Sequence, residues 1–320
     1  MTVTEQDPIW HIAGIGALGS VVAGCFHQTG VDVRLILKNE QQLSIYQQSE
    51  LTILKAHSVF TACPEATVLD HLGDEPIDYL LCCVKAYDIT GLLMRLKQNL
   101  HPNSIIILIH NGLGVLDEIK TSLPQSRVIL GISTIGAYQE SAFAVRAFLG
   151  GKFYLGQAIG QYTPKEIKSV CATFAKAKLP YQWVGNIQPI LWEKFAINCC
   201  INLLTALFKC KNGDLLFHKE ILKNLSCEVT QVIRVYGMDL SAEELFHKVI
   251  SVIESTTDNY SSMYKDIENN KQTEIYYLNE HLVKLAQQKK MRIPVHSELL
   301  NKFYSKFHEQ KFHGSNLEHG

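Results

Sequence analysis

The first half of the chain alternates between short apolar runs and stretches with helical spacing. Its apolar runs have the length of β-strands and lie at residues 9–13, 31–37, 79–84, 104–109 and 128–132. A helix is predicted over Ser20 to Gln28, and helical patterns separate several of the later runs. Apolar strands separated by helices are typical of a parallel sheet that is buried on both faces. The first half is therefore predicted to have an α/β fold.

The pattern changes after about Gly185, where strand signals end and helical spacing continues. Before that point, residues 142–156 have the pattern of a short antiparallel addition, and Pro164 can open a helix at its first turn. After it, Ser241 and Glu244 have the spacing of a capping box. Helices are predicted over Pro189–Lys209, Lys219–Tyr236, Ala242–Ser255 and Glu274–Lys289. We therefore predict two domains, an α/β domain over residues 1–184 and an all-helical domain over residues 185–320.

Composition and charge narrow the classes of partner. Thirty Lys and Arg against 31 Asp and Glu give a formal net charge of -1, without the basic excess of a dedicated nucleic-acid binder. Hydrophobic residues make up 47% of the 320 residues and charged residues 19%, which argues against long disordered segments. Apolar runs such as Ile105–Ile109 and Leu203–Phe208 fall short of the roughly 18 residues that span a membrane. We expect neither nucleic acid nor a membrane as a partner.

Cysteine and histidine usage indicates neither a disulfide framework nor a metal site. Nine cysteines are an odd number, and adjacent pairs such as Cys82/Cys83 and Cys199/Cys200 lie in apolar runs where a thiol behaves as a small hydrophobe. The 13 histidines have no zinc spacing, so no metal site is expected. The first eight residues lack the basic cluster and apolar core of a secretory signal. We expect reduced core cysteines and a cytoplasmic location.

A glycine-rich turn follows the first predicted strand. It reads Gly14-Ile15-Gly16-Ala17-Leu18-Gly19 and matches the pattern G-x-G-x-x-G. Such turns occur in many folds, but this one lies directly between a strand and a helix. In that place the glycines permit a tight turn and the close approach of a pyrophosphate, and the helix N-terminus favours an anion. The sequence therefore predicts a dinucleotide-binding domain of the Rossmann type.

The residue at the end of the second predicted strand bears on which dinucleotide binds. Lys38 stands nineteen residues after Gly19, where an NAD enzyme usually has Asp or Glu on the ribose hydroxyls. A cation there attracts a 2'-phosphate, so NADPH/NADP is the predicted cofactor. Two alternatives stay open: Lys38 is a solvated lysine beside Glu40, or Arg34 is the phosphate partner.

Two polar segments follow predicted strands at their carboxyl ends. Lys85 follows the strand that ends at Val84, and His110-Asn111-Gly112 follows the strand over residues 104–109. Open α/β sheets bind ligands at this edge. Asn111 before a glycine is equally typical of an ordinary turn. Lys85 and Asn111 are therefore candidate ligand contacts.

The first predicted helix of the second half carries a polar stripe. Lys194, Asn198 and Asn202 are spaced at i, i+4 and i+8, which places them within about 80° of one another around the helix. One interpretation is a solvent-exposed face. The surrounding residues of that helix are strongly apolar, which favours a buried stripe whose polar groups need partners.

A second polar set lies further along the chain. If one helix were continuous, Asn259, Ser262, Asp266 and Glu274 would fall within an arc of about 120°. The polar stretch 268–273 is expected to break that helix, with Thr273 capping the next segment. The shared arc is therefore weak support for a common site.

Taken together, these segments resemble the ketopantoate reductase (2-dehydropantoate 2-reductase) family over nearly the whole chain. The resemblance implies a Rossmann domain followed by a helical domain, with the active site in the cleft between them. It implies that Lys194 and Glu274 are catalytic, and that Lys85 and Asn111 lie near the cofactor. The matching blocks are Gly14–Gly19, Val84–Ala86, His110–Gly114, Leu191–Lys194, Asn198–Cys199 with Ile201–Asn202, Asn259–Met263 with Asp266, and Thr273–Ile275.

Further implications concern the substrate and the reaction. The substrate contacts implied by the resemblance are Asn111, Asn198, Asn202, Asn259 and Ser262. Some members have arginine at the position of Lys38, and lysine keeps the charge but loses the bidentate fork. The implied reaction is reduction of 2-dehydropantoate to pantoate with NADPH, in pantothenate and coenzyme A biosynthesis. The alternatives are a reductase of another 2-oxo or 3-hydroxy acid and a non-catalytic NADP sensor. The expected partner is a small molecule, and the protein is expected to be a monomer or homodimer.

Overall fold

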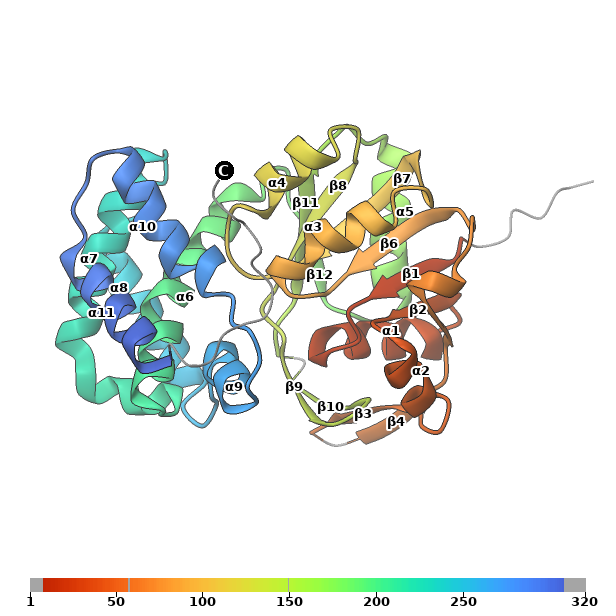
Figure 1. The fold of residues 1–320 in the computed structure, drawn as a ribbon, viewed down its shortest axis with the longest axis horizontal. Helices are drawn as coiled ribbons and strands as arrows, with labels where there is room; N and C mark the ends of the chain where they lie inside the picture. The colour runs from red at the N-terminus through yellow and green to blue at the C-terminus, as the bar shows by residue number, and fades with distance from the viewer. Residues whose placement is uncertain (1–7, 57, 149, 308–320) are drawn as a thin grey trace, which may run out of the picture. The chain divides into compact units, whose positions relative to one another are not determined.

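The structure is a computed structural model, and it describes residues 8–56, 58–148 and 150–307 (Figure 1). The chain forms two compact units. Unit 1 contains the chain up to His110 and residues 115–187, and unit 2 contains Asn111–Gly114 and the chain from Gln188 onward. The predicted division of roles at residues 184 and 185, with cofactor binding before it and catalysis after it, stays a prediction.

Unit 1 is built on an eight-stranded sheet in the order β12-β11-β8-β7-β6-β1-β2-β5. Pairing is parallel from β5 through β8, and β11 joins β8 in the antiparallel direction. The predicted α/β fold with a parallel sheet is confirmed. The strands are β1 (Trp10–Ala13), β2 (Val33–Leu37), β5 (Glu65–Val68), β6 (Ile77–Cys82), β7 (Leu100–Ile109), β8 (Val128–Ser133), β11 (Phe153–Ile159) and β12 (Tyr181–Trp183).

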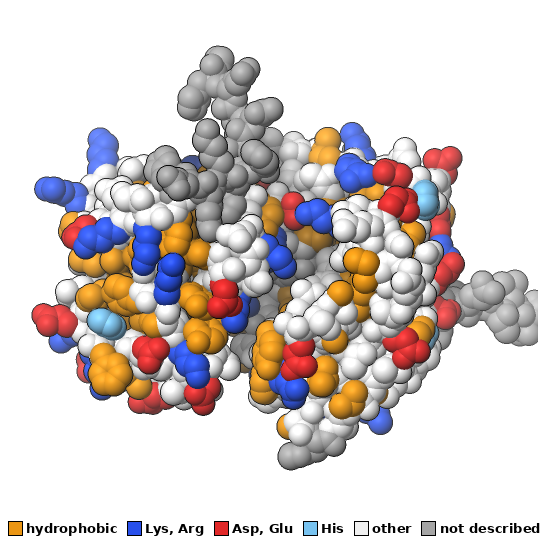
Figure 2. All heavy atoms as spheres, turned by 60° about the horizontal axis from the view of Figure 1, so that its bottom comes forward, with side chains coloured by type: hydrophobic (Ala, Val, Ile, Leu, Met, Phe, Trp, Pro, Cys, Tyr) orange, Lys and Arg blue, Asp and Glu red, His pale blue; other side chains and the backbone are white. Residues whose placement is uncertain are grey.

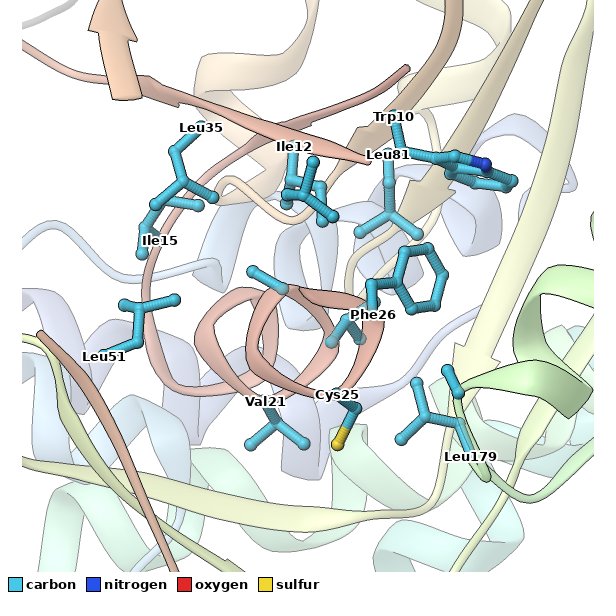
Figure 3. Packing of buried hydrophobic residues seen from close by; sticks show 14 of the residues in the cluster. Trp10, Ile12, Ile15, Val21, Cys25, Phe26, Leu35, Leu51, Leu81 and Leu179 are labelled. Atoms are coloured by element: carbon cyan, nitrogen blue, oxygen red, sulfur yellow. The ribbon is translucent and has the colours of Figure 1, made fainter. Parts of the chain in front are cut away.

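Helices cover the sheet because both of its faces are apolar. Figure 3 shows Phe26 of α1 directed toward Trp10 and Leu81 of the sheet, and the Trp10 and Phe26 rings meet edge to face at 5.2 Å. Phe174 of α5 packs against Phe26 at 5.5 Å. Neighbouring side chains along a strand point to opposite faces of the sheet. Helices α1 and α5 lie on one face, and α3 and α4 cover the other (Figure 1). The helices of unit 1 are α1 (Ala17–Gln28), α2 (Glu40–Tyr46), α3 (Ala86–Arg95), α4 (Val115–Ser122) and α5 (Pro164–Lys176), with a 3-10 turn η1 (Leu69–His71).

A second, four-stranded sheet packs on α1. Its order is β4 (Ser58–Ala62), β3 (Leu51–Lys55), β10 (Ala144–Phe148) and β9 (Gly136–Ser141). The predicted antiparallel addition over 142–156 is partly wrong, because the β9–β10 hairpin begins at Gly136 and β11 belongs to the main sheet. A Cβ at Gly24 of α1 would lie 2.9 Å from Ile53 Cγ1, so this glycine permits the close approach of β3. That contact joins distant segments, and no local pattern indicates it.

Unit 2 is helical, as predicted. The structure confirms the first three predicted helices and the Ser241–Glu244 capping box. The fourth predicted helix, Glu274–Lys289, is confirmed over Asn279–Gln288, but its start is wrong. Glu274 precedes a 3-10 turn η3 (Ile275–Tyr277), and Leu278, with φ -114° and ψ -100°, separates that turn from the helix. The elements are α6 (Gln188–Phe208), η2 (Asn212–His218), α7 (Lys219–Val235), α8 (Ala242–Ser255), α9 (Ser262–Glu268), α10 (Asn279–Gln288) and α11 (Pro294–Phe307).

Helix α6 is the apolar centre of unit 2. By length and composition alone, this helix could cross a membrane, which corrects the expectation that every apolar stretch is too short. Its most apolar window is 67% buried inside the protein, so burial in the core accounts for the apolar composition. On the face drawn in Figure 2, positive and negative side chains are interspersed, in keeping with the near-neutral charge.

All nine cysteines are free thiols. Cys82, Cys199 and Cys200 are buried, as expected of small hydrophobes in the core, and burial raises the pKa of the Cys82 and Cys200 thiols to about 12. Cys63 is exposed, so the interpretation as a core residue is wrong for that position. It directly follows β4, between the buried residues Ala62 and Pro64, so its side chain points to solvent while its neighbours are buried.

A buried carboxylate joins α7 to the start of α11. Glu228 accepts hydrogen bonds from the backbone N–H of Val295 at 2.8 Å and of His296 at 2.9 Å. Its Oε2 also lies 2.9 Å from His296 Nδ1. Burial raises the pKa of Glu228, but the bonds from His296 and Val295 outweigh this and hold the pKa below its ordinary value. The ionised carboxylate therefore satisfies the free N–H groups of the first turn of α11.

Replacing Glu228 by Gln is expected to lower the free energy of unfolding by about 2 to 3 kcal/mol, because an amide nitrogen cannot accept these bonds. A depressed carboxyl pKa stabilises the fold above the unfolded pKa, so the wild-type advantage should shrink as the pH falls below about 4.5. Urea unfolding at neutral and acidic pH measures both effects. Glu298→Gln on α11 is the control, since its exposed pair with Lys302 should contribute less than about 1 kcal/mol. Equal losses in the two variants would contradict the expectation.

Candidate active site

The glycine turn after β1 is packed tightly on one side and open on the other. Gly14 has φ +87°, and a Cβ there would lie 2.4 Å from the backbone nitrogen of Val84. A Cβ at Gly19 would lie 2.1 Å from the Gly14 carbonyl oxygen, whereas a Cβ at Gly16 would have nothing within 4 Å. Ile15 is buried, and Ala17 and Leu18 form the first turn of α1. The open side at Gly16, beside an α1 N-terminus without a side-chain cap, fits an approaching pyrophosphate.

The turn lies at the topological switch point of the main sheet. The chain runs from β1 to β2 and β5 on one side and then returns to β6 on the other side of β1. Ligands of open α/β sheets bind at the carboxyl ends of strands where the order reverses. Lys85 follows β6 there and is the N-cap residue of α3. The contact of Gly14 with Val84 thus places the Lys85 segment beside the glycine turn.

Lys38 and Arg34 differ in their surroundings. Lys38 is exposed directly after β2, and the neighbouring Glu40 pairs with His71 at 3.0 Å. The Arg34 guanidinium is bound by Glu75, and its Nη2 lies 2.6 Å from Glu65 Oε2. Two carboxylates around one guanidinium leave a local negative balance, which repels a phosphate. Arg34 is therefore a poor phosphate partner, and Lys38 remains the candidate.

Asn111 meets Glu274 within unit 2. Asn111 Nδ2 donates to Glu274 Oε2 at 3.2 Å, and the Leu113 backbone N–H donates to the Tyr277 carbonyl at 2.9 Å. Gly112 has φ +89°, and a Cβ there would lie 2.4 Å from the Tyr277 carbonyl oxygen. The short loop 111–114 therefore packs against the segment that carries Glu274. Glu274 itself is 4% exposed.

Lys194 is the cation of this site. It lies on α6, is half-buried, and interacts electrostatically with Glu274. Burial lowers the pKa of Lys194 to about 8, and the charge of Glu274 opposes that fall. A lysine in this range holds a proton at neutral pH and releases it far more readily than a solvated lysine does. The structure thus brings together Lys194, Glu274 and Asn111.

The rest of the α6 stripe is partly buried. Asn202 is 6% exposed, so the interpretation as a solvent face is wrong for this residue. Asn198 is half-buried, one turn after Lys194. Asn279 at the start of α10 donates to the Cys199 carbonyl at 2.9 Å and fixes α6 at this level. The stripe therefore faces protein on part of its length.

Asn259 precedes α9 and Ser262 is the first residue of that helix, and both are exposed. The helix ends at Glu268, as the polar stretch after it indicates, so the continuous arc to Glu274 does not form. The Thr273 hydroxyl accepts from the Ile275 N–H at 3.4 Å, but the N-cap residue of η3 is Glu274, so the cap expected at Thr273 is displaced by one residue. The role of Asn259 and Ser262 as substrate contacts stays a prediction.

Models of protein families match nearly the whole chain. The model described as ketopantoate reductase PanE/ApbA matches residues 10–160, and its C-terminal counterpart matches residues 186–306. The chain belongs to the ketopantoate reductase family. Family membership makes the protein an oxidoreductase that uses a nicotinamide dinucleotide and a small-molecule substrate.

Individual relatives cover almost the full length. The 2-dehydropantoate 2-reductase of Salmonella typhi is 31% identical over 310 residues, which are 96% of this chain and 97% of that protein. Its counterpart in Escherichia coli O157:H7 is 30% identical with the same coverage. The PanE/ApbA family ketopantoate reductase structure from Ralstonia eutropha JMP134 matches with a TM-score of 0.85 at 21% identity, over 95% of this chain and 99% of that chain. D-mandelate dehydrogenase with NADH and anilino(oxo)acetate gives a TM-score of 0.86 at 21% identity, over 94% and 99%. These structures share the fold.

The sequence of this ketopantoate reductase family member did not indicate what the loop after β7 packs against. Asn111 does follow the carboxyl end of a parallel strand, as predicted, but the sequence did not indicate that residues 111–114 group with the helical unit. The signal was Gly112 and Gly114 around Leu113, since both glycines have positive φ and allow a backbone to approach closely. That signal indicates a close contact but does not name the partner.

Proposed function

We propose that this protein reduces 2-dehydropantoate to pantoate with NADPH, a step of pantothenate biosynthesis. The observation that carries the proposal is the half-buried Lys194 beside the buried Glu274, which is itself held by Asn111. The proposal places the reaction in the cytoplasm and leaves open whether the protein acts as a monomer or a homodimer.

The chain's own residues fit a dinucleotide. We assign the pyrophosphate to the open side of Gly16 and the N-terminus of α1, and the 2'-phosphate to Lys38, with Lys85 beside the turn. When bound, the reduced nicotinamide supplies a hydride to the ketone carbon of the substrate. In this assignment residues 1–184 bind NADPH, and residues 185–320, with Asn111, bind and protonate the substrate.

Lys194 supplies the proton that the reduction requires. Negative charge develops on the carbonyl oxygen, and an ammonium group at that atom neutralises it where it forms. Glu274 keeps the lysine protonated at neutral pH and orients it, while Asn111 fixes the Glu274 carboxylate by its amide N–H. The lowered pKa of Lys194 makes transfer of the proton easier.

The remaining polar residues suit a hydroxylated 2-oxo acid. Asn198, Asn202 and Asn259 offer both donors and acceptors, and Ser262 offers a hydroxyl. Together these groups can hold a carboxylate and a hydroxyl at the same time. We propose that they bind these two groups of 2-dehydropantoate.

A steady-state assay of NADPH oxidation tests the proposal against its alternatives. We expect the highest kcat/KM for 2-dehydropantoate in a panel of 2-oxo acids that includes unhydroxylated and aromatic ones. A different preferred acid would overturn the substrate assignment. Binding of NADPH without turnover of any acid would overturn the enzymatic role and favour a sensor.

The pH profile should report Lys194. Because the acid must be protonated, kcat/KM for the reduction is expected to fall about tenfold per pH unit above pH about 8, the pKa of Lys194. Oxidation of pantoate needs the deprotonated amine and should rise through the same pH. Glu274→Gln removes the charge that opposes the fall in this pKa, so its inflection should move to lower pH. A flat profile across this range would contradict the assignment.

Cofactor preference should depend on Lys38. Lys38→Asp places a carboxylate at the proposed phosphate site, and we expect about a tenfold or greater rise in the Kd of NADPH with little change for NADH. Lys38→Arg keeps the charge and is the control. Titration by nicotinamide fluorescence measures both constants. Unchanged NADPH affinity in Lys38→Asp would move the phosphate site elsewhere.

A further inference from the structure

A buried threonine joins α6 to the start of α9. Thr205 is 0% exposed, and its Oγ1 lies 2.6 Å from Ser261 Oγ. The same oxygen lies 2.9 Å from the Asn202 carbonyl and 3.2 Å from the Ile201 carbonyl, one turn earlier on α6. Thr205 is thus bonded both to the turn that carries Asn202 and to a different element.

Ser261 is the N-cap residue of α9. Its hydroxyl accepts from the Tyr264 backbone N–H at 3.1 Å, and the residue is only 6% exposed. An N-cap sets where a helix begins and how its first turn is directed. Ser262, the first residue of α9, follows directly and is exposed. The position of Ser261 therefore determines the position of Ser262.

The other end of this segment is fixed too. Asn212 of η2 donates its backbone N–H to the Asn259 carbonyl at 2.9 Å and its Nδ2 to Thr256 Oγ1 at 2.9 Å. A Cβ at Gly213 would lie 2.5 Å from Thr257 Cγ2, so this contact is close. The backbone of residues 256–261 is held at both ends, while the side chains of Asn259 and Ser262 stay exposed.

Burial alone does not require the bond to Ser261. Thr230 of α7 is also buried, at 3% exposed. Within the part of the chain that the structure describes, its hydroxyl bonds only inside its own helix, to the Ser226 carbonyl at 2.7 Å and the Cys227 carbonyl at 3.0 Å. A buried helical threonine is thus satisfied by its own helix. The additional bond from Thr205 links two elements that both carry proposed substrate contacts.

We propose that Thr205 and Ser261 are positioning residues that hold Asn202 of α6 and the Asn259–Ser262 segment in register for the substrate. This inference rests on the proposed function. Neither hydroxyl contacts the substrate in the proposal, since both are buried. Loss of the bridge should loosen substrate binding in the ground state and the transition state alike, which raises KM and leaves kcat nearly unchanged.

The first test compares two matched threonines. Thr205→Val is expected to raise KM for 2-dehydropantoate about five- to tenfold, with kcat and the Kd of NADPH within about twofold of wild type. Thr230→Val loses the same bonds within its helix and should leave KM within about twofold. Thr205→Ser keeps the hydroxyl and should restore KM. Thr205→Val and Thr230→Val with the same KM would overturn the proposal.

The second test approaches the bridge from its other side and does not depend on a folded Thr205→Val. Ser261→Ala removes the partner hydroxyl. Ser241→Ala removes the N-cap serine of α8, whose hydroxyl, among residues 8–56, 58–148 and 150–307, bonds only to Glu244 of its own helix. We expect a raised KM for Ser261→Ala alone, and no further rise in the double variant with Thr205→Val. An effect equal to that of Ser241→Ala, or fully additive effects in the double variant, would contradict the bridge. A wild-type protein without turnover of 2-dehydropantoate would instead overturn the proposed function.

Discussion

Replacing Lys194 by alanine is expected to lower kcat for 2-dehydropantoate reduction by about a hundredfold or more, because the proton donor at the carbonyl oxygen is lost. NADPH affinity should stay within about twofold of wild type, since the proposed cofactor contacts are in unit 1. Steady-state kinetics and fluorescence titration measure the two effects. Lys284→Ala, which removes an exposed lysine of α10, is the control and should retain wild-type turnover.

Lys194→Ala removes the positive charge beside Glu274 as well as the proton donor. A second variant therefore separates the effect of losing the charge from the effect of losing the proton. Lys194→Arg keeps a positive charge beside Glu274, but a guanidinium does not release its proton in this pH range. We expect a folded protein with strongly reduced kcat and no inflection near pH 8. Turnover within about twofold of wild type in Lys194→Ala would show that the proton comes from elsewhere.

Replacing Gly19 by alanine is expected to destabilise unit 1 by about 3 kcal/mol or more and to abolish NADPH binding. The reason is steric, because the new Cβ would lie 2.1 Å from the Gly14 carbonyl oxygen, and both atoms belong to the turn itself. Thermal unfolding and NADPH titration measure the two losses. Wild-type stability of Gly19→Ala would contradict this account of the turn.

Gly16→Ala separates cofactor binding from folding. Apart from its chain neighbours Ile15 and Ala17, no described residue has an atom within 4 Å of the new Cβ, so Tm should stay near the wild-type value. The methyl group would stand where we place the pyrophosphate, and we expect the Kd of NADPH to rise about tenfold or more. A Cβ at Gly91 of α3 also has open space around it, so Gly91→Ala is the control and should lower neither Tm nor the affinity for NADPH. Unchanged NADPH affinity in Gly16→Ala would remove the pyrophosphate from this turn.

Features that depend on a few neighbouring residues were predictable from the sequence. The alternation of apolar runs and helical spacing indicated the parallel sheet, since side-chain period and strand length are local properties. The glycine turn, the capping box at Ser241 and the helix at Pro164 were predictable for the same reason. The helix predicted from Glu274 begins only at Asn279, because a 3-10 turn and Leu278 precede it, and the carbonyl of Tyr277 in that turn accepts from the distant Leu113 N–H.

For the candidate site, too, the residues could be named from the sequence, whereas their contacts could not. Resemblance to known reductases named Lys194, Glu274 and Asn111, but their spacing in the chain says nothing about how closely they meet. Only the folded chain brings Asn111 to Glu274, commits Arg34 to Glu65 and Glu75, and links Thr205 to Ser261.

The amino-acid sequence by itself determined the two-part architecture and the place of the dinucleotide turn, because both depend on patterns within about ten residues of each other. The tertiary structure decided the acidity of Lys194 and the fixed backbone around Asn259 and Ser262. A pKa depends on burial and on a carboxylate 80 residues away in the chain, and such contacts form only when distant segments pack together.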